Sequence, residues 1–414
     1  MERSQRVVGS PIDFVRRLSM VPQGVTIVIA GFLPILAIVS MFPAIPAIID
    51  HFSADPDARW KVPMMVSAPG LTIALVAPFA GFFVDRFGRR PLLIGATLLY
   101  GIVGTAPFFL DSLNALIACR LLLGVAEAAI LTTVNTLIAD YWDDRGRKDW
   151  LFLQGLAGPF LASGVILMAG AASSVRWNGI FLVYAVAFPI FLAMLFWLFE
   201  PRRPEKTSAV TGAREPQVRT PFPAASVALI GSVTLVASAL YYVFIISGSL
   251  AWREIGVMDP ARIGQLTAIP SLFVMLGALV FRLMGGKPHA VQLATFFLLL
   301  GIGLAGIGLA SDWRWMVIAL MVQQTGAGMA VPTIIAWAQT RLPFEHRGRG
   351  MGVWTACFFF GQFSSPWLVH QTENLVGSMQ GAFLAAGLVG VIAAIVIGAA
   401  RTLRAPVSPI AVAE

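Results

Sequence analysis

The sequence predicts an all-α membrane protein with twelve transmembrane helices, arranged as two pseudo-symmetric six-helix bundles. The first observation is composition: 57% of the 414 residues are hydrophobic and only 12% are charged, and the mean hydropathy is +0.80. A soluble protein carries about 25% charged residues, so these residues cannot cover a globule of this size in water. The other two observations are a series of long apolar stretches and a polar segment that divides them into two sets of six.

Each apolar stretch is long enough to cross a bilayer, because a transmembrane helix needs about 20 largely apolar residues. Pro34, Pro43 and Pro46 lie within the first stretch and predict that its helix is bent. The twelve expected helices cover residues 24–49, 62–84, 91–110, 113–139, 150–172, 179–199, 222–249, 265–284, 290–311, 315–340, 351–372 and 379–400.

Basic residues are distributed unequally between the two sides of the expected membrane. Most of the 29 lysines and arginines fall in the two tails, in the central linker and in the loops on the same side. Because cytoplasmic loops carry an excess of lysine and arginine, we expect both termini in the cytoplasm. This topology also accounts for the net charge of +8 without a nucleic-acid partner. The opposite side holds only Arg59, Lys61, Arg176, Arg253, Arg262 and Arg314.

A polar segment at residues 200–221, rich in proline, charge and small residues, separates the first six stretches from the last six. This composition predicts a flexible cytoplasmic linker. An internal repeat supports the division, because the RGR at 145–147 recurs at 347–349 and the same spacing aligns Gly124 with Gly326. Two related six-helix halves are typical of secondary transporters. The expected parts are a tail at 1–23, a bundle at 24–199, the linker at 200–221, a bundle at 222–400 and a tail at 401–414.

The most specific motif is the charged hinge between the second and third stretches, GFFVDRFGRRP at residues 81–91. It resembles the signature loop of the major facilitator superfamily, G-x-x-x-D-R-x-G-R-R, and the two-bundle pattern resembles that family over essentially the whole chain. The resemblance implies a cytoplasmic latch between the bundles, in which Asp85 lies at the start of the eleventh helix or pairs with Arg145 or Arg147. The alternative is a loop whose arginines only fix the membrane orientation. The matching residues are Gly81, Asp85, Arg86, Gly88, Arg89 and Arg90.

Arg120 is the one basic residue deep inside an apolar stretch, and Glu127 follows two helical turns later on the same face. An arginine at mid-helix costs about 2.5–3.5 kcal/mol on insertion scales, so such residues usually face a partner or a water-filled cavity. The string resembles the superfamily's fourth-helix motif, R-x-x-x-G, whose arginine is implicated in proton coupling, although Glu127 stands where a small residue is usual. We predict that Glu127 is a proton switch beside a fixed cation. The alternative is that Arg120 extends towards Asp111 and the lipid headgroups.

Two further sets of residues are candidates for the transport pathway. Gly158 and Pro159 resemble the superfamily's antiporter motif, but Ala162 and Ser163 occupy its usual glycine pair, and close packing around a proline explains them equally well. Three glutamines are expected to line a cavity, because an amide side chain in lipid needs a partner: Gln323, Gln324 and Gln362.

The sequence contains no phosphate-binding loop and no metal-ligand spacing, and its four histidines and two cysteines are scattered. We therefore expect no enzyme, no cofactor, no bound metal and no ATP-driven pump. Energy for transport would come from an ion gradient, a substrate gradient or exchange.

These observations favour a secondary active transporter that works by alternating access and exports a small neutral or amphipathic organic compound in exchange for protons. The first stretch lacks an acidic residue. Many cation-selective efflux pumps of the family that the chain resembles carry an acid there, so the resemblance argues against obligatory strongly cationic substrates. The alternatives are proton-coupled uptake of a small metabolite or organic anion held by Arg120, and a transporter-like sensor or scaffold. The expected partners are a small-molecule substrate, protons and the lipid bilayer. The expected setting is a bacterial inner membrane, with the monomer that is usual in the family.

Overall fold

The computed structural model describes residues 21–201 and 222–400, and every regular element within them is a helix. The two predicted tails and nearly all of the predicted linker lie outside these residues, so the domain boundaries stay predictions. The predicted bend in the first helix is confirmed, because short helical pieces follow one another and begin next to Pro34, Pro43 and Pro46. These pieces are α2 (Pro22–Ala30), α3 (Leu33–Val39), η1 (Phe42–Ala44) and α4 (Ile45–His51).

The remaining segments extend beyond the predicted ends by at most about two turns. Most are single long helices, but the sixth consists of η3 followed by α9, and the eighth is divided into α11 and α12 at Leu272. The rest of the first bundle consists of α5 (Ala58–Phe87), α6 (Arg89–Thr105), η2 (Ala106–Phe109), α7 (Leu113–Tyr141), α8 (Asp144–Val175), η3 (Gly179–Val186) and α9 (Ala187–Trp197). The second bundle consists of α10 (Ala224–Glu254), α11 (Pro260–Ser271), α12 (Phe273–Leu283), α13 (His289–Gly308), α14 (Trp313–Arg341), η4 (Phe344–His346), α15 (Arg347–Val376) and α16 (Met379–Ala399).

Eleven helical segments of the described chain are long and apolar enough to cross a membrane. The helix α15 is as long, with 30 residues, but carries more polar side chains and is not among the eleven. It packs against α5 of the first bundle and α10 of the second. A helix in that position needs fewer apolar residues, because protein rather than lipid covers two of its sides.

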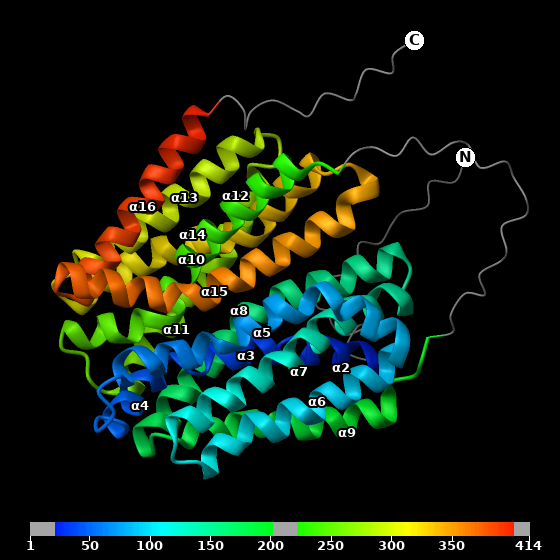
Figure 1. The fold of residues 1–414 in the computed structure, drawn as a ribbon, viewed down its shortest axis with the longest axis horizontal. Coiled ribbons are helices and arrows are strands. Elements are labelled where there is room, and N and C mark those ends of the chain that lie inside the picture. The colour runs from blue at the N-terminus through cyan, green and yellow to red at the C-terminus, as the bar shows by residue number, and fades with distance from the viewer. Residues whose placement is uncertain (1–20, 202–221, 401–414) are drawn as a thin grey trace, which may run out of the picture.

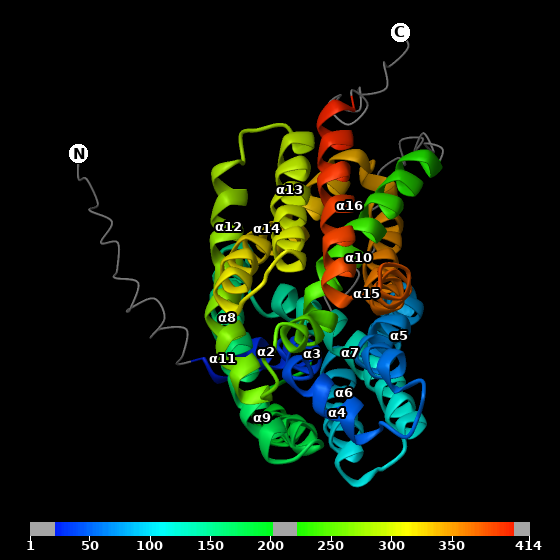
Figure 2. The ribbon, with the colours of Figure 1, turned by 90° about the vertical axis from the view of Figure 1, so that its left-hand side faces the viewer.

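The two bundles lie one above the other and meet along their inner helices (Figures 1 and 2). We call the end where Pro201 and Phe222 lie the linker end, and the end where α4 joins α5 the far end. Polar contacts between the bundles gather towards the far end: Arg253 donates to Asp50 at 2.9 Å, and Ser67 donates to the carbonyl of Phe363 at 3.3 Å. The axes of the bundles approach each other there and diverge towards the linker end (Figure 1).

Within each bundle, glycines allow the close approach of helix backbones that small residues permit in membranes. A Cβ at Gly124 of α7 would lie 2.6 Å from the carbonyl oxygen of Pro69 in α5. The repeat aligns Gly124 with Gly326, but Gly326 lies against Leu300 of α13 instead. The glycine of α14 that meets α12 is Gly328, so the repeat pairs the equivalent helices but not the equivalent glycines.

Candidate functional site

The predicted cation, Arg120, points into the first bundle and is 2% exposed. Its NH1 donates a hydrogen bond to the hydroxyl of Tyr184 at 2.5 Å, and its guanidinium carbon lies 4.9 Å from that ring's centroid and 5.5 Å from that of Phe181. The side chain therefore does not extend towards the headgroups. Asp111, the nearby acid, instead contacts His51 at 2.6 Å.

Tyr184, on η3, connects Arg120 to the broken first helix. Its hydroxyl donates to the carbonyl of Ala37 at 2.7 Å, and Ser40 contacts the same hydroxyl at 3.4 Å. Tyr100 of α6 donates to the carbonyl of Leu33 at 2.6 Å. These bonds tie the first, third, fourth and sixth helical segments together around one buried cation.

Glu127 lies at the middle of the 29 residues of α7 and is 3% exposed. Its Oε1, and the Nε and NH2 of Arg120, have no hydrogen-bond partner among the described residues. Glu127 is within electrostatic range of Arg120 and of Tyr100, and also of Tyr242 on α10. An ionised carboxylate without a partner is costly in a buried site, so this position favours a proton, a donor group or a cation beside Glu127.

An aromatic cluster on α10 and α15 includes Tyr242, a residue of the second bundle within electrostatic range of Glu127. The rings of Trp354 and Phe358 stack with centroids 5.3 Å apart and planes inclined by 18°, and the ring of Tyr242 lies 5.7 Å from that of Phe358. The indole N–H of Trp354 is buried and has no partner in the described part of the chain. The second bundle therefore contributes aromatic ring faces and one hydrogen-bond donor without a partner among the described residues, the indole N–H of Trp354.

The three predicted cavity glutamines are all buried but occupy different places. Gln362 of α15 lies against Gly70 of α5, at the contact between the bundles. The backbone of Gln323 packs on Gly303 of α13, inside the second bundle, and both polar atoms of its side chain lack partners among the described residues. Gln324 is 7% exposed. The structure thus brings Gln362 to the contact between the bundles and the backbone of Gln323 to the interior of the second bundle.

The hinge motif forms a helix break with a well-defined cap. Gly88 has φ 84°, which suits the turn glycine of the motif. The amides of Arg89 and Arg90 donate to the two carboxylate oxygens of Glu200 at 2.9 and 2.7 Å, so Glu200 caps the start of α6.

The arginine side chains of the hinge bind within the first bundle. Arg89 pairs with Asp140 of α7 at 2.8 Å, and Arg90 donates to the carbonyl of Leu198 at 2.8 Å. Arg86 and Arg147 are exposed. The side chains of Asp85 and Arg145 lie outside what the structure describes, so the latch remains a prediction, and Gly81 lies within α5.

Gly158 and Pro159 lie inside α8, next to the break in the first helix. A Cβ at Gly158 would lie 3.1 Å from the ring of Phe32, so this glycine lets α8 approach the kink between α2 and α3. Pro159 lies in the interior of α8. This geometry agrees with close packing and does not by itself distinguish antiport from symport.

Sequence reasoning missed Tyr184 and Glu200 as functional or supporting residues. The available signal for Tyr184 was that it is the one tyrosine in the sixth apolar stretch. Glu200 falls at the start of the polar linker, where an acid looks like ordinary solvated surface. Each residue forms hydrogen bonds with residues that are distant in the sequence, so its role depends on the folded structure.

The long apolar helices in two bundles, with Arg120 and Glu127 buried on one of them, are typical of a multi-pass membrane protein. The family model of the major facilitator superfamily matches residues 27–287 and 230–413. The chain belongs to this family, and it is a transporter rather than an enzyme.

Two bacterial relatives match along most of their length. The 3-(3-hydroxy-phenyl)propionate transporter of Escherichia coli strain K12 is 26% identical over 329 residues, 76% of this chain and 76% of that protein. The class B tetracycline resistance protein of Escherichia coli is 26% identical over 312 residues, 71% and 74% of the two chains.

Other comparisons support the fold more than the function. The efflux pump dotC of Dothistroma septosporum is 27% identical over 205 residues, 49% of this chain, and the chain spans only 34% of that protein's length. A crystal structure of a D-xylose–proton symporter superposes with a TM-score of 0.75 at 15% identity, covering 91% of this chain and 96% of that one. At this identity the likeness concerns the fold alone.

Proposed function

We propose that this transporter exports a small neutral or amphipathic organic compound in exchange for protons. The observation that carries the proposal is Glu127, a buried carboxylate with an unused oxygen at the middle of α7, beside the fixed cation Arg120. Ionisable residues inside membranes mark ion or proton pathways. The tetracycline resistance protein among the relatives supports export.

The exchange follows from competition for one carboxylate. When Glu127 is ionised, its charge is balanced by Arg120 and by a donor group of the substrate. When Glu127 is protonated, that attraction is lost and the substrate leaves. Tyr184 holds Arg120 in place throughout, so the cation does not follow the substrate.

The aromatic cluster of Trp354, Phe358 and Tyr242 would bind the flat or apolar part of the substrate. Aromatic rings gain both from burial and from offset or edge contacts. The unused N–H of Trp354 would bind an acceptor on the same molecule. Because Tyr242 belongs to the second bundle and Glu127 to the first, one substrate would contact both bundles.

The second candidate is proton-coupled uptake of an organic anion. Two guanidinium nitrogens of Arg120 have no hydrogen-bond partner among the described residues, and they are suited to a carboxylate. The relative that transports 3-(3-hydroxy-phenyl)propionate supports this alternative.

The setting of the protein belongs to the same proposal. We place both termini and the linker end in the cytoplasm, following the excess of basic residues there. The membrane would be a bacterial inner membrane, and the working unit a monomer. In the opposite conformation, the hinge motif around Asp85 would latch the linker ends of the bundles.

One assay separates export from uptake by the sign of a proton signal. Purified protein is placed in liposomes that contain a pH-sensitive dye, and tetracycline or 3-(3-hydroxy-phenyl)propionate is added outside as the probe of each class. Antiport predicts that the lumen becomes alkaline as substrate enters. Acidification of the lumen would instead establish symport, and substrate entry without a pH change would contradict proton coupling.

A further inference from the structure

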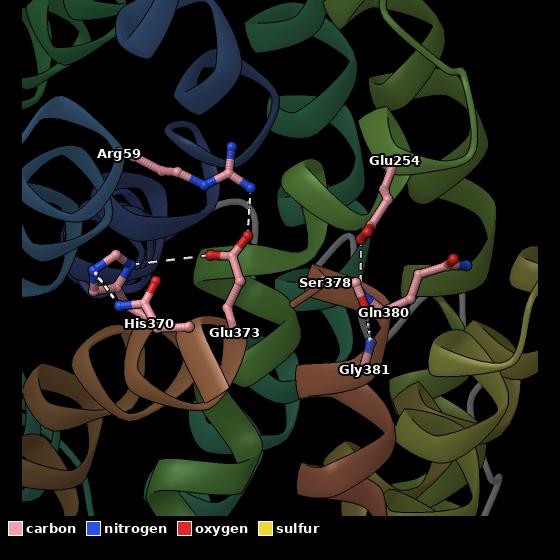
Figure 3. Close-up of polar contacts among 8 residues, drawn as sticks. Arg59, Glu254, His370, Glu373, Ser378, Gln380 and Gly381 are labelled. Atoms are coloured by element: carbon pink, nitrogen blue, oxygen red, sulfur yellow. Dashed lines mark hydrogen bonds and ion pairs between the residues drawn. The ribbon is translucent and has the colours of Figure 1, made fainter. Parts of the chain in front are cut away.

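A second ionic cluster lies at the far end, where it joins the two bundles (Figure 3). Arg59 of α5 donates a hydrogen bond to Oε1 of Glu373 on α15. The carboxylate side chain is only 9% exposed, whereas that of Arg59 is 60% exposed. A buried carboxylate of one bundle is thus neutralised by a cation that the other bundle holds from outside.

His370 lies one turn before Glu373 on the same helix and faces the same carboxylate. Its Nδ1 is 4.0 Å from Oε2 of Glu373, is buried, and has no hydrogen-bond partner among the described residues. The side-chain amide of Asn374 donates to Nε2 at 3.2 Å. In the neutral ring, the proton therefore lies on Nδ1 and points towards Glu373.

A small cavity between the bundles adjoins this cluster, with Arg59, His370 and Glu373 in its wall. It has room for about one water molecule. Ser247 of α10 lines the same cavity and is 2% exposed. Water in this cavity would lie between the donor Arg59 of the first bundle and the proton-accepting Glu373 of the second.

The other charged groups nearby are already engaged. Glu254 of α10 is within electrostatic range of Arg59, and its carboxylate accepts the amide of Gln380 at the start of α16 at 2.7 Å (Figure 3). Arg253 pairs with Asp50 on the other side of α10.

At the start of α5, Lys61 pairs with Asp55 and Asp57. The amide of Asp57 and the ammonium of Lys61 hold the pKa of Asp55 below its usual value, so this acid stays charged in mild acid. Lys61 likewise lowers the pKa of Asp57. Among these acids, Glu373 is the one that is buried, faces a histidine and bridges the bundles.

We propose that Glu373 and His370 form a second proton-binding site, and that its occupancy decides whether the bundles stay closed at the far end. The proposal deepens the proton-coupled function and rests on it for its place in the transport cycle. With Glu373 ionised, the bond to Arg59 holds α5 against α15. A proton on Glu373, received from the cavity directly or through His370, removes the charge that Arg59 neutralises and releases the far ends.

The site would therefore admit protons at the far end before Glu127 takes them at mid-membrane. Removing one partner of a buried ion pair is strongly unfavourable, because the other charge stays buried and unpaired. Arg59 avoids this cost, since its side chain is mostly exposed and can turn into solvent. The pair can thus open without leaving a buried cation behind.

The test measures opening at Ser247 without substrate or a proton gradient. Ser247→Cys is made in a protein in which Cys119 and Cys357 are replaced by alanine, and the purified protein in nanodiscs is treated with a charged maleimide. Rates are compared at about pH 4 and about pH 8, which bracket the ordinary pKa values of glutamate and histidine side chains. Because only the thiolate reacts, each rate is divided by the rate of free cysteine with the same maleimide at the same pH, and the rates below are these normalised rates. We expect the normalised rate to be several-fold higher at the lower pH.

Three variants, each made in the Ser247→Cys protein, test whether the pair of Arg59 and Glu373 causes the pH response. Glu373→Gln imitates the protonated acid and should react fast at both pH values. Arg59→Gln should do the same, and it changes a mostly exposed side chain, so it remains informative if Glu373→Gln does not fold. Asp111→Asn is the matched control, because it removes the other far-end histidine–carboxylate contact, which lies within the first bundle, and should keep the pH response.

A slow rate at both pH values in the starting protein would overturn the proposal. An unchanged pH response in Glu373→Gln or Arg59→Gln, or its loss in Asp111→Asn, would also overturn it. Proton-coupled export is tested separately by the liposome dye assay, so a failure of either proposal can be recognised on its own.

Discussion

The hydroxyl of Tyr184 accepts a hydrogen bond from Arg120 and donates one to the carbonyl of Ala37. One side chain thus connects the buried cation of α7 to the broken first helix. The guanidinium is held by a neutral group, so its charge remains available to the acid two turns away. In the proposed mechanism, Tyr184 would hold Arg120 in place while Glu127 exchanges its partner.

Tyr184→Phe removes the bond without changing the size of the ring. Arg120 then has one more buried donor without a partner, and a hydrogen bond to a charged group contributes about 1.5–3 kcal/mol. We expect a lower midpoint of thermal unfolding and slower transport. Unfolding of the detergent-purified protein, followed by tryptophan fluorescence, measures the first effect. An unchanged midpoint would show that Arg120 is supported by other groups.

Gly124→Val tests the close contact between α5 and α7. A Cβ at Gly124 would lie 2.6 Å from a backbone oxygen, which cannot move as the tip of a flexible side chain can. We expect strong destabilisation or loss of folded protein. The matched control is Gly95→Ala in α6, where an added Cβ meets nothing within 4 Å. Comparable amounts of folded protein by gel filtration for both variants would contradict this packing.

Glu200→Ala removes the carboxylate that accepts the first two amides of α6. Loss of such a cap costs about 0.5–2 kcal/mol. Asp140→Asn removes only the partly exposed pair with Arg89, and such pairs contribute about 0–1 kcal/mol. The midpoint of thermal unfolding should therefore be lowered more by Glu200→Ala than by Asp140→Asn. The reverse order would mean that the salt bridge, rather than the cap, holds the hinge.

Asp85→Asn tests the latch implied by the signature motif. The change keeps the size of the side chain and removes its charge, so the amount of folded protein in the membrane should be unchanged. Transport should fall sharply, because the linker ends could no longer be held closed. Radiolabelled substrate exchange in liposomes measures this, and normal exchange would leave the hinge with an orienting role only.

Much of the fold could be predicted because it depends on local composition. Each long apolar stretch became a helix, and Pro34, Pro43 and Pro46 correctly marked a bent first segment. The burial of Arg120 and Glu127 inside the protein could also be predicted, because exposing a charged side chain to lipid costs free energy. These inferences need no knowledge of which helices touch.

The partners could not be predicted, because they depend on how helices distant in sequence are rotated against one another. Tyr184 lies 64 residues from Arg120, and Glu373 lies 314 residues from Arg59. Small shifts matter as well, since Gly326 and Gly328 differ by two positions but contact different helices.

The most direct test of the account is proton movement in Glu127→Gln. Liposomes containing wild-type protein or the variant are loaded with a pH-sensitive dye, labelled substrate is added outside only, and its uptake is followed together with the luminal pH. Glutamine imitates the protonated acid, which releases substrate in this account, so we predict that the variant takes up substrate more slowly than the wild type and produces no substrate-dependent proton flux. Proton flux equal to that of the wild type would contradict the assignment of Glu127 as the site of coupling.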